Sequence, residues 1–244
     1  MRMRIREKLH RFHYFGVVFL CFLPFWPLLL LWSKNPDRHF SRFVKIRRWI
    51  AKGSSALAGF RFHIRYEVPI DWSKAHILCP NHTSNLDIAA LIKVCPADFT
   101  FMGKKELLRN PVTGIYFRTI DIPVDRKSKI SGFRAIKRAA ASLDKGRSVV
   151  IFPEGGINDH YPPHIGPFKP GPFRLAAEKN ACIIPVIIHN AWELHWNDGS
   201  PYGSRPGTIY IDVLAPIDPK TQQLQEKTRQ KILYTWNKGP NKSL

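Results

Sequence analysis

Residues 76–94 read HILCPNHTSNLDIAALIKV, in which a short apolar run, a polar loop and a second apolar run follow one another. We predict a strand over His76–Pro80 and a helix over Asp87–Val94, which the hydroxyl and amide side chains between them can cap. A side chain between a strand and the following helix lies where α/β sheets commonly place their functional sites. This loop is therefore the first candidate for a site.

The same alternation of short apolar runs and longer amphipathic runs continues after Gly59. The other predicted strands are Phe60–Glu67, Phe99–Met102, Ile120–Pro123, Ser148–Phe152, Ile183–Ile188 and Thr208–Leu214. The other predicted helices are Lys105–Asn110, Ser131–Lys145, Pro172–Lys179 and Pro219–Trp236. Strands that alternate with helices indicate an α/β fold with a mostly parallel sheet flanked by helices. We expect one such domain over residues 59–244.

The N-terminal part of the chain has a different composition. Residues 12–32, FHYFGVVFLCFLPFWPLLLLW, contain no Asp, Glu, Lys or Arg, and about 20 such residues suffice to cross the core of a bilayer. Pro24 and Pro27 would kink or break a helix there, and both flanks are basic. This favours a hydrophobic, membrane-embedded helical hairpin at the cytoplasmic face of the inner (plasma) membrane, with a single span as the alternative. We expect residues 1–58 to form these N-terminal membrane-anchoring helices.

The net charge is strongly positive, because 38 Lys and Arg stand against 18 Asp and Glu and give +20 at pH 7. This excess indicates an anionic partner, which is nucleic acid, an acidic lipid surface or an acidic carrier protein. The apolar N-terminal run favours anionic membrane lipids, and we expect no nucleic acid partner. The basic, aromatic-rich stretch Phe40–Ile50 suits a helix that lies on lipid headgroups, or it is the solvated face of a domain helix.

His82 and Asp87 are the candidate catalytic residues of the polar loop. If Asp87 lies in the first turn of the following helix, its carboxylate can fold back and accept a hydrogen bond from the His82 imidazole. A carboxylate fixes the tautomer of a histidine and raises its basicity, as a general base requires. The alternative is that Asp87 only caps the helix. Ser84 lacks the G-x-S-x-G setting of a serine nucleophile.

Two further segments carry candidate binding residues. Glu154 and Gly155 in the segment FPEGG at residues 152–156 directly follow a predicted strand, so a carboxylate and backbone N–H groups can face a ligand there. Arg126 ends the segment DIPVDR at residues 121–126, where it can bind a phosphate or pair with Asp125. The four cysteines form no C-x-x-C pair and the histidines show no ligand spacing, so we expect reduced thiols and no metal.

Together these segments resemble the glycerolipid acyltransferases of the 1-acylglycerol-3-phosphate (lysophosphatidic acid) acyltransferase type. Residues 81–87 fit the first family motif, N-H-x-S-x-x-D, at every defined position. The other similar segments, in the family's order, are KKEL at 104–107 with DR at 125–126, FPEG at 152–155, PFKPG at 167–171 and IIPV at 183–186.

The resemblance implies an activity and a set of site residues. It implies transfer of a fatty acyl group from acyl-CoA or acyl-ACP to the hydroxyl of a lysophospholipid, most simply 1-acylglycerol-3-phosphate, which gives phosphatidic acid. The partners would be an acyl carrier protein or a coenzyme A thioester and the lysophospholipid acceptor, with no cofactor. His82 and Asp87 would be catalytic. The substrate-binding residues would be Arg126, Glu154, Gly155, Lys105 and Lys169.

The chain departs from the family directly after Gly155. The family usually has Thr-Arg there, and its Arg helps to hold the phosphate of the acceptor, whereas this chain has Gly156 and Ile157. Either Arg126, Lys169 or Lys105 compensates for the lost cation, or the acceptor is a different lysolipid, such as a lyso-aminolipid. An acyl-thioesterase and a non-catalytic membrane adaptor are the remaining alternatives.

Overall fold

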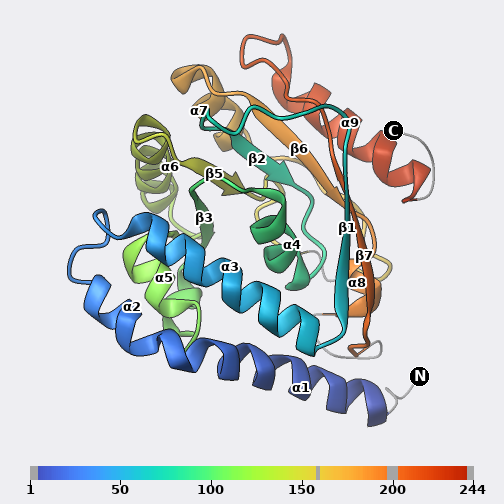
Figure 1. The fold of residues 1–244 in the computed structure, drawn as a ribbon. Coiled ribbons are helices and arrows are strands. Elements are labelled where there is room, and N and C mark those ends of the chain that lie inside the picture. Colours follow the sequence, from blue (N-terminus) through green and yellow to red (C-terminus); the bar gives the residue numbers. More distant parts are fainter. Residues whose placement is uncertain (1–4, 158–159, 197–202, 241–244) are drawn as a thin grey trace.

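The computed structural model describes residues 5–157, 160–196 and 203–240. Within these residues, seven strands form one sheet in the order β1-β7-β6-β2-β5-β3-β4 (Figure 1). The strands are β1 Phe60–Tyr66, β2 Ile77–Pro80, β3 Phe99–Lys104, β4 Ile122–Val124, β5 Ser148–Ile151, β6 Ile183–Ile188 and β7 Gly207–Val213. All neighbouring strands are parallel except β6 and β7. The predicted α/β fold with a mostly parallel sheet is confirmed.

Helices cover both faces of the sheet and bury alternate residues of its strands. Leu78 of β2 packs into a core shared with α3 Phe40–Leu57, α4 Leu86–Val94 and α5 Gly114–Thr119. Its neighbours Ile77 and Cys79 face the other core, which contains α6, α7 and α9. The bounds of the remaining helices are α6 Lys129–Asp144, α7 Gly171–Lys179, α8 Ala191–Leu194 and α9 Leu224–Lys238. The central strands are thus buried on both faces, as is usual for parallel sheets.

Several predicted element ends shift, and two short helices were not predicted. Residues 105–109 form a 3₁₀ helix rather than an α-helix, and α9 begins at Leu224 rather than at residue 219. The predicted strand at residues 120–123 begins at Ile122 because α5 precedes it. The α5 sequence GIYFRT has Gly and several β-branched or aromatic residues, which favour helices weakly, so burial of its apolar side chains stabilises this helix. Helix α8 is only four residues long.

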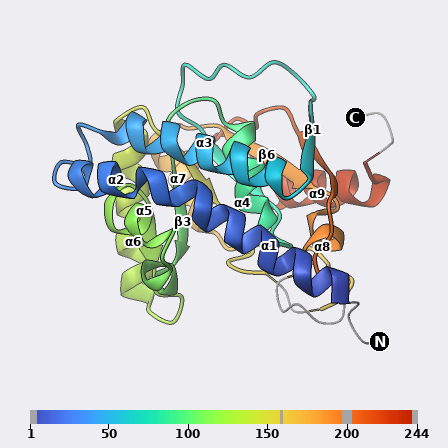
Figure 2. The same ribbon diagram turned by 60° about the horizontal axis from the view of Figure 1, so that its bottom comes forward.

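The apolar N-terminal run forms α1 Ile5–Phe22 and α2 Trp26–Trp32, which a 3₁₀ turn at Leu23–Phe25 separates. The chain therefore bends at the predicted proline break, and it reverses direction only at residues 33–39. Helix α3 then runs back beside α1 (Figures 1 and 2). Among the described residues, one helical stretch, Ile5–Trp32, is long and apolar enough to cross a membrane. Only 17% of its most apolar part is buried within the protein.

Helix α3 belongs to the folded domain, which is the second of the two possibilities that the sequence allowed for residues 40–50. Phe43, Val44 and Ile50 are buried against the body of the protein instead of facing lipid headgroups. Trp49 stays exposed on the opposite side of the helix, near Phe25 of the 3₁₀ turn. The apolar stripe of α3 thus completes one of the two cores.

A buried ion pair joins α3 to the sheet. Arg47 lies 3.1 Å from the carboxylate of Asp121, and their side chains are 7% and 3% exposed. The guanidinium also lies over the rings of Phe99, Phe101 and Tyr116. Asp121 in turn accepts the Phe101 N–H at 3.0 Å. This pair therefore fixes α3 relative to β3 and β4.

We expect Asp121→Ala to lower the free energy of unfolding by about 3–5 kcal/mol, because it leaves the buried Arg47 charge unpaired. The matched control is Asp37→Ala, which removes the exposed pairs of Asp37 with Lys145 and Arg147 and should cost less than about 1 kcal/mol. Thermal unfolding in the same detergent compares the two variants. Equal losses would contradict a special contribution from the buried pair.

Candidate active site

The candidate site forms where β2 and β5 end side by side. The two strands are parallel neighbours, so the loops that follow them emerge at the same edge of the sheet. His82 follows β2, and Glu154 follows β5. Glu154 Oε1 accepts the backbone N–H of His82 at 2.9 Å, and the His82 ring stacks on Phe152 with 3.8 Å between centroids. The structure thus brings two of the sequence motifs into direct contact.

His82 and Asp87 form the predicted pair. His82 Nδ1 lies 2.9 Å from Asp87 Oδ2, and the side chains are 12% and 0% exposed. The same carboxylate oxygen accepts the backbone N–H groups of Thr83 at 2.7 Å and Ser84 at 2.8 Å. Asp87 therefore holds the loop and the imidazole together. Because Nδ1 donates to the carboxylate, the lone pair of His82 is on Nε2, where it can accept a proton.

The other polar side chains of this loop attach it to its surroundings. Asn81 forms two hydrogen bonds with the backbone of Ile188 on β6, at 2.8 and 3.1 Å. The Ser84 hydroxyl donates to the carbonyl of His195 at 2.6 Å and accepts the Leu86 N–H at 3.2 Å. Ser84 is fully buried, so its hydroxyl is a structural group and not a nucleophile.

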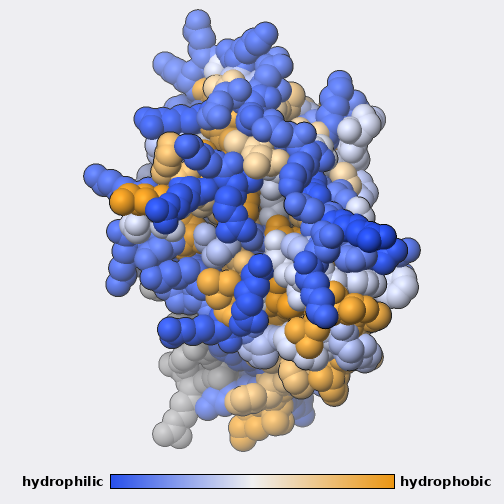
Figure 3. Space-filling view, turned by 90° about the vertical axis from the view of Figure 1, so that its left-hand side faces the viewer, coloured by the Kyte–Doolittle hydropathy of each residue, from blue (hydrophilic) through white to orange (hydrophobic). Residues whose placement is uncertain are grey.

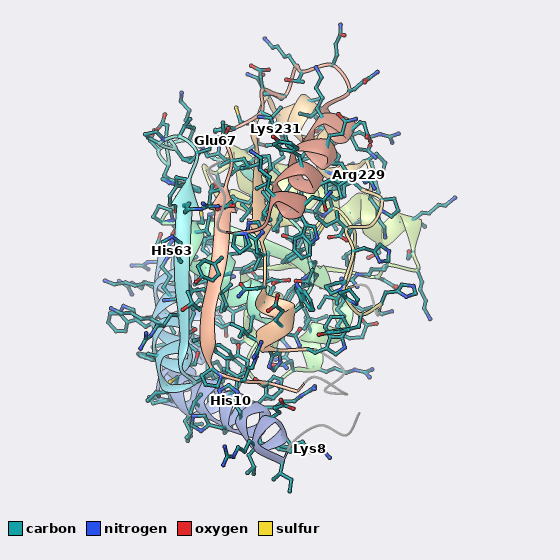
Figure 4. The ribbon with its side chains drawn as sticks, turned by 90° about the vertical axis from the view of Figure 1, so that its right-hand side faces the viewer. Lys8, His10, His63, Glu67, Arg229 and Lys231 are labelled. Carbon is teal, nitrogen blue, oxygen red and sulfur yellow. The ribbon has the colours of Figure 1, made fainter. Side chains whose placement is uncertain are left out.

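The N-terminal helix α1 reaches this loop through His195. The His195 ring lies edge-on to Tyr14 and Phe15 of α1, and its Nδ1 is 3.1 Å from Ser204 Oγ. Ser204 is also 2.8 Å from Nδ1 of His10, another residue of α1 (Figure 4). Burial lowers the pKa of His195 to about 4, so this histidine is neutral at pH 7. No spacing rule in the sequence singles out His10 or His195.

Glu154 connects the site to the loop over residues 155–170. Its Oε2 accepts the Gly166 N–H at 2.8 Å, and Arg229 of α9 donates to the Gly166 carbonyl at 3.3 Å (Figure 4). Burial raises the pKa of Glu154 to about 7, although the hydrogen bonds from Gly166 and His82 act in the opposite direction. Glu154 therefore links β2, this loop and the C-terminal helix.

Two cations cover the glycines of the FPEGG segment. Gly155 has a φ of +80°, and a Cβ there would lie 2.6 Å from Nζ of Lys169. A Cβ on Gly156 would lie 2.9 Å from a guanidinium nitrogen of Arg126. The structure thus places Arg126 and Lys169 beside the loop that carries Glu154.

The remaining predicted site residues are arranged differently. Lys105 is exposed and pairs with Asp125 at 2.6 Å, so the ion pair of Asp125 is with Lys105 rather than with Arg126. The N–H of Gly155 donates to the Phe152 carbonyl at 3.0 Å and is not available to a ligand. Within the described parts of the chain, no group of three His, Cys, Asp or Glu side chains is arranged to hold a metal ion.

Comparison with known proteins gives related sequences and a related structure. An uncharacterized acyltransferase of Schizosaccharomyces pombe is 29% identical over 67% of this chain and 59% of its own length. The 1-acyl-sn-glycerol-3-phosphate acyltransferase alpha of Mus musculus is 27% identical over 71% of this chain and 61% of its own. This chain therefore spans less than two thirds of either relative.

The crystal structure of the 1-acyl-sn-glycerophosphate (LPA) acyltransferase PlsC from Thermotoga maritima superimposes with a TM-score of 0.77. The superposition covers 96% of both chains at 18% sequence identity, so the fold is shared along almost the whole length. The sequence profile of the Acyltransferase family matches residues 60–189, which include the His82–Asp87 pair and the FPEGG segment. The chain belongs to the Acyltransferase family.

Proposed function

We propose that this acyltransferase moves a fatty acyl group from a coenzyme A or carrier-protein thioester to the hydroxyl of a lysophospholipid, with 1-acyl-sn-glycerol-3-phosphate as the acceptor. The observation that carries the proposal is the hydrogen bond from His82 Nδ1 to buried Asp87, which leaves Nε2 as a base at the sheet edge. The names of the mouse and Thermotoga maritima proteins support the choice of acceptor.

In this mechanism His82 Nε2 takes the proton of the acceptor hydroxyl while that oxygen attacks the thioester carbonyl. The tetrahedral intermediate then loses the thiolate, which takes the proton from the imidazolium, so the products are the acylated lipid and the free thiol. Asp87 stabilises the imidazolium between these steps. The Lys169 ammonium and the N–H of Gly156 are candidates to stabilise the oxyanion, since the Gly155 N–H is already used.

The FPEGG segment supports the choice of a phosphorylated acceptor. Arg126 lies against Gly156, where the Thr-Arg of similar acyltransferases would carry side chains. We infer that the absence of a side chain at residue 156 lets Arg126 lie over this segment and bind the acceptor phosphate together with Lys169. A lyso-aminolipid acceptor is the second candidate, because the chain has Ile157 in place of the usual cation.

We also propose that α1 and α2, within residues 1–58, anchor the acyltransferase domain of residues 59–244 in the cytoplasmic leaflet of the inner membrane, while α3 packs on that domain. The support is the exposed apolar surface of α1 and α2. It includes Ile5, Leu9, Phe12, Phe19, Leu20, Leu23, Leu28, Leu30 and Leu31. The many basic residues on both flanks suit anionic headgroups. The lysolipid acceptor would then reach His82 from the bilayer, past the part of α1 that contacts His195.

We expect His82→Ala and Asp87→Asn each to lower kcat by about 10²–10⁴, since the first removes the base and the second weakens its support. His63→Ala is the matched control, because His63 lies exposed on β1 (Figure 4). The measurement follows a labelled acyl thioester with and without lysophosphatidate in detergent micelles. Full activity of His82→Ala would exclude the mechanism. Fatty acid release without an acceptor would identify a thioesterase, and an inactive wild type would indicate an adaptor.

If Arg126 binds the acceptor phosphate, its removal should lower the activity with phosphorylated acceptors selectively. Arg126→Gln should lower kcat/KM for lysophosphatidate by about 10–100-fold, the effect of losing a charge-assisted hydrogen bond, and should alter the rate with an uncharged acceptor little. Gly156→Thr should act in the same direction, because its Cβ displaces the guanidinium of Arg126. Lys127→Gln, at an exposed neighbouring cation, is the control. Equal losses with charged and uncharged acceptors would contradict phosphate binding by Arg126.

Glu154 predicts a pH dependence of stability. The folded protein keeps the Glu154 proton up to about pH 7, whereas the unfolded chain releases it near 4.5. Between these values the unfolded state binds fewer protons, so the free energy of unfolding falls as the pH rises. The free energy of unfolding, measured by denaturation at about pH 5 and about pH 7.5, should fall more in the wild type than in Glu154→Gln, whose side chain cannot titrate. The control is Glu178→Gln at an exposed position, in which the free energy of unfolding should fall by the wild-type amount. The same fall in Glu154→Gln would contradict a contribution of Glu154 to the pH dependence.

A further inference from the structure

The first half of α6 exposes apolar and basic side chains together. Ile130 and Phe133 are 65% and 62% exposed, and Lys137 Nζ lies over the Phe133 ring at 4.7 Å from its centroid. We call this surface the α6 face. It consists of Lys129, Ile130, Phe133, Arg134 and Lys137, all of them exposed. Figure 3, which looks at the side of the molecule where α6 lies in Figure 1, shows hydrophobic atoms among long hydrophilic side chains.

The charge of this segment is of one sign. No acidic residue occurs over residues 126–143, whereas the basic residues there are Arg126, Lys127, Lys129, Arg134, Lys137 and Arg138. The N-terminus of a helix carries a partial positive charge, so cations near it are unfavourable for the helix itself. A basic cluster in that place therefore has no stabilising effect on α6 and suits an anionic ligand.

The α6 face points away from the membrane-facing helices. Ala135, Ala139 and Leu143 of α6 pack on the sheet face that α7 and α9 also cover. Helices α1 and α3 belong to the core on the opposite face of the sheet. The sheet thus lies between the cores of the two groups of helices; the C-terminal end of α6, away from the α6 face, meets the turn before α3, where Lys145 pairs with Asp37 at 2.8 Å. A bilayer against α1 and α2 therefore does not reach the α6 face.

The α6 face also begins at the edge of the candidate site. Arg126, three residues before α6, lies against Gly156 of the FPEGG segment. The hydroxyl of Ser131 in the first turn of α6 accepts the Asp125 N–H at 2.9 Å, which fixes this end of the helix to the end of β4. A ligand on the α6 face is consequently next to the loop that carries Glu154.

We propose that the α6 face docks an acidic acyl carrier protein, which presents the thioester donor to His82; this rests on the proposed function. The basic residues match an acidic protein surface. The exposed Ile130 and Phe133 require apolar counterparts, which a protein provides and the phosphates of coenzyme A do not. The donor and the lipid acceptor thus approach the site from opposite faces of the sheet.

The test uses the full-length protein in micelles with lysophosphatidate and the same acyl chain on a carrier protein or on coenzyme A. Arg134→Glu/Lys137→Glu should lower kcat/KM for the carrier-protein thioester about tenfold or more, mainly through KM, because it opposes the charge of the partner. The rate with acyl-CoA should change less than about twofold. Phe133→Ser, which keeps the charge, should also lower only the carrier-protein rate.

The matched control is Lys227→Glu/Lys231→Glu on α9, which changes the net charge equally at exposed positions (Figure 4). This variant should leave kcat/KM unchanged with both the carrier-protein thioester and acyl-CoA. Three results would overturn the docking proposal: no transfer from the carrier protein, equal losses with both donors, or reduced binding of the α6 variant to anionic vesicles that accounts for its loss. If the wild type transfers acyl groups from neither thioester, the proposed function fails instead.

Discussion

The site depends on one buried carboxylate. Asp87 is removed from water, and a charge there is tolerated only if donors surround it. Three donors converge on its Oδ2: the imidazole of His82 and the backbone N–H groups of Thr83 and Ser84. The same contacts shape the loop, begin α4 and select the tautomer of His82. The geometry is thus compatible with both interpretations that the sequence left open: Asp87 binds the backbone just before α4 and also holds the imidazole of His82.

The layered fold gives this loop two different environments. On one side of the sheet, α1 and α2 expose apolar side chains, and α1 contacts the loop through His195. On the other side, α6 begins with basic residues beside the FPEGG segment. The proposed reaction joins a membrane lipid to a water-soluble thioester and therefore needs access of both kinds. The parallel sheet provides it, because the ends of β2 and β5 lie between the two helical layers.

Much of this arrangement follows from local patterns, whereas contacts between distant residues do not. All seven strands and the contact of His82 with Asp87 were predictable, because apolar runs mark buried strands and the pair lies within one loop. Arg47 lies in a strongly basic stretch, and only the position of Asp121, 74 residues later, explains its burial. The pair of Lys105 with Asp125 and the bond of Ser84 to His195 likewise depend on how separate elements pack. The short helix α5 forms because tertiary contacts override weak helix propensity.

Because α1 contacts His195, removing the N-terminal helix would affect the candidate site. The His195 ring contacts Tyr14 and Phe15 of α1 and the hydroxyl of Ser204, and that hydroxyl also contacts His10. The backbone carbonyl of His195 in turn accepts the hydrogen bond of Ser84. Deleting α1 would therefore expose the His195 ring, which Tyr14 and Phe15 contact, and would remove the hydrogen bond between His10 and Ser204. A domain truncated in this way would lose the packing behind His195, whose carbonyl holds the loop of the candidate site through Ser84. Helix α1 and the domain that carries the candidate site are packed as one folding unit in this chain, so the apolar helix is part of the architecture of the site rather than an addition to it.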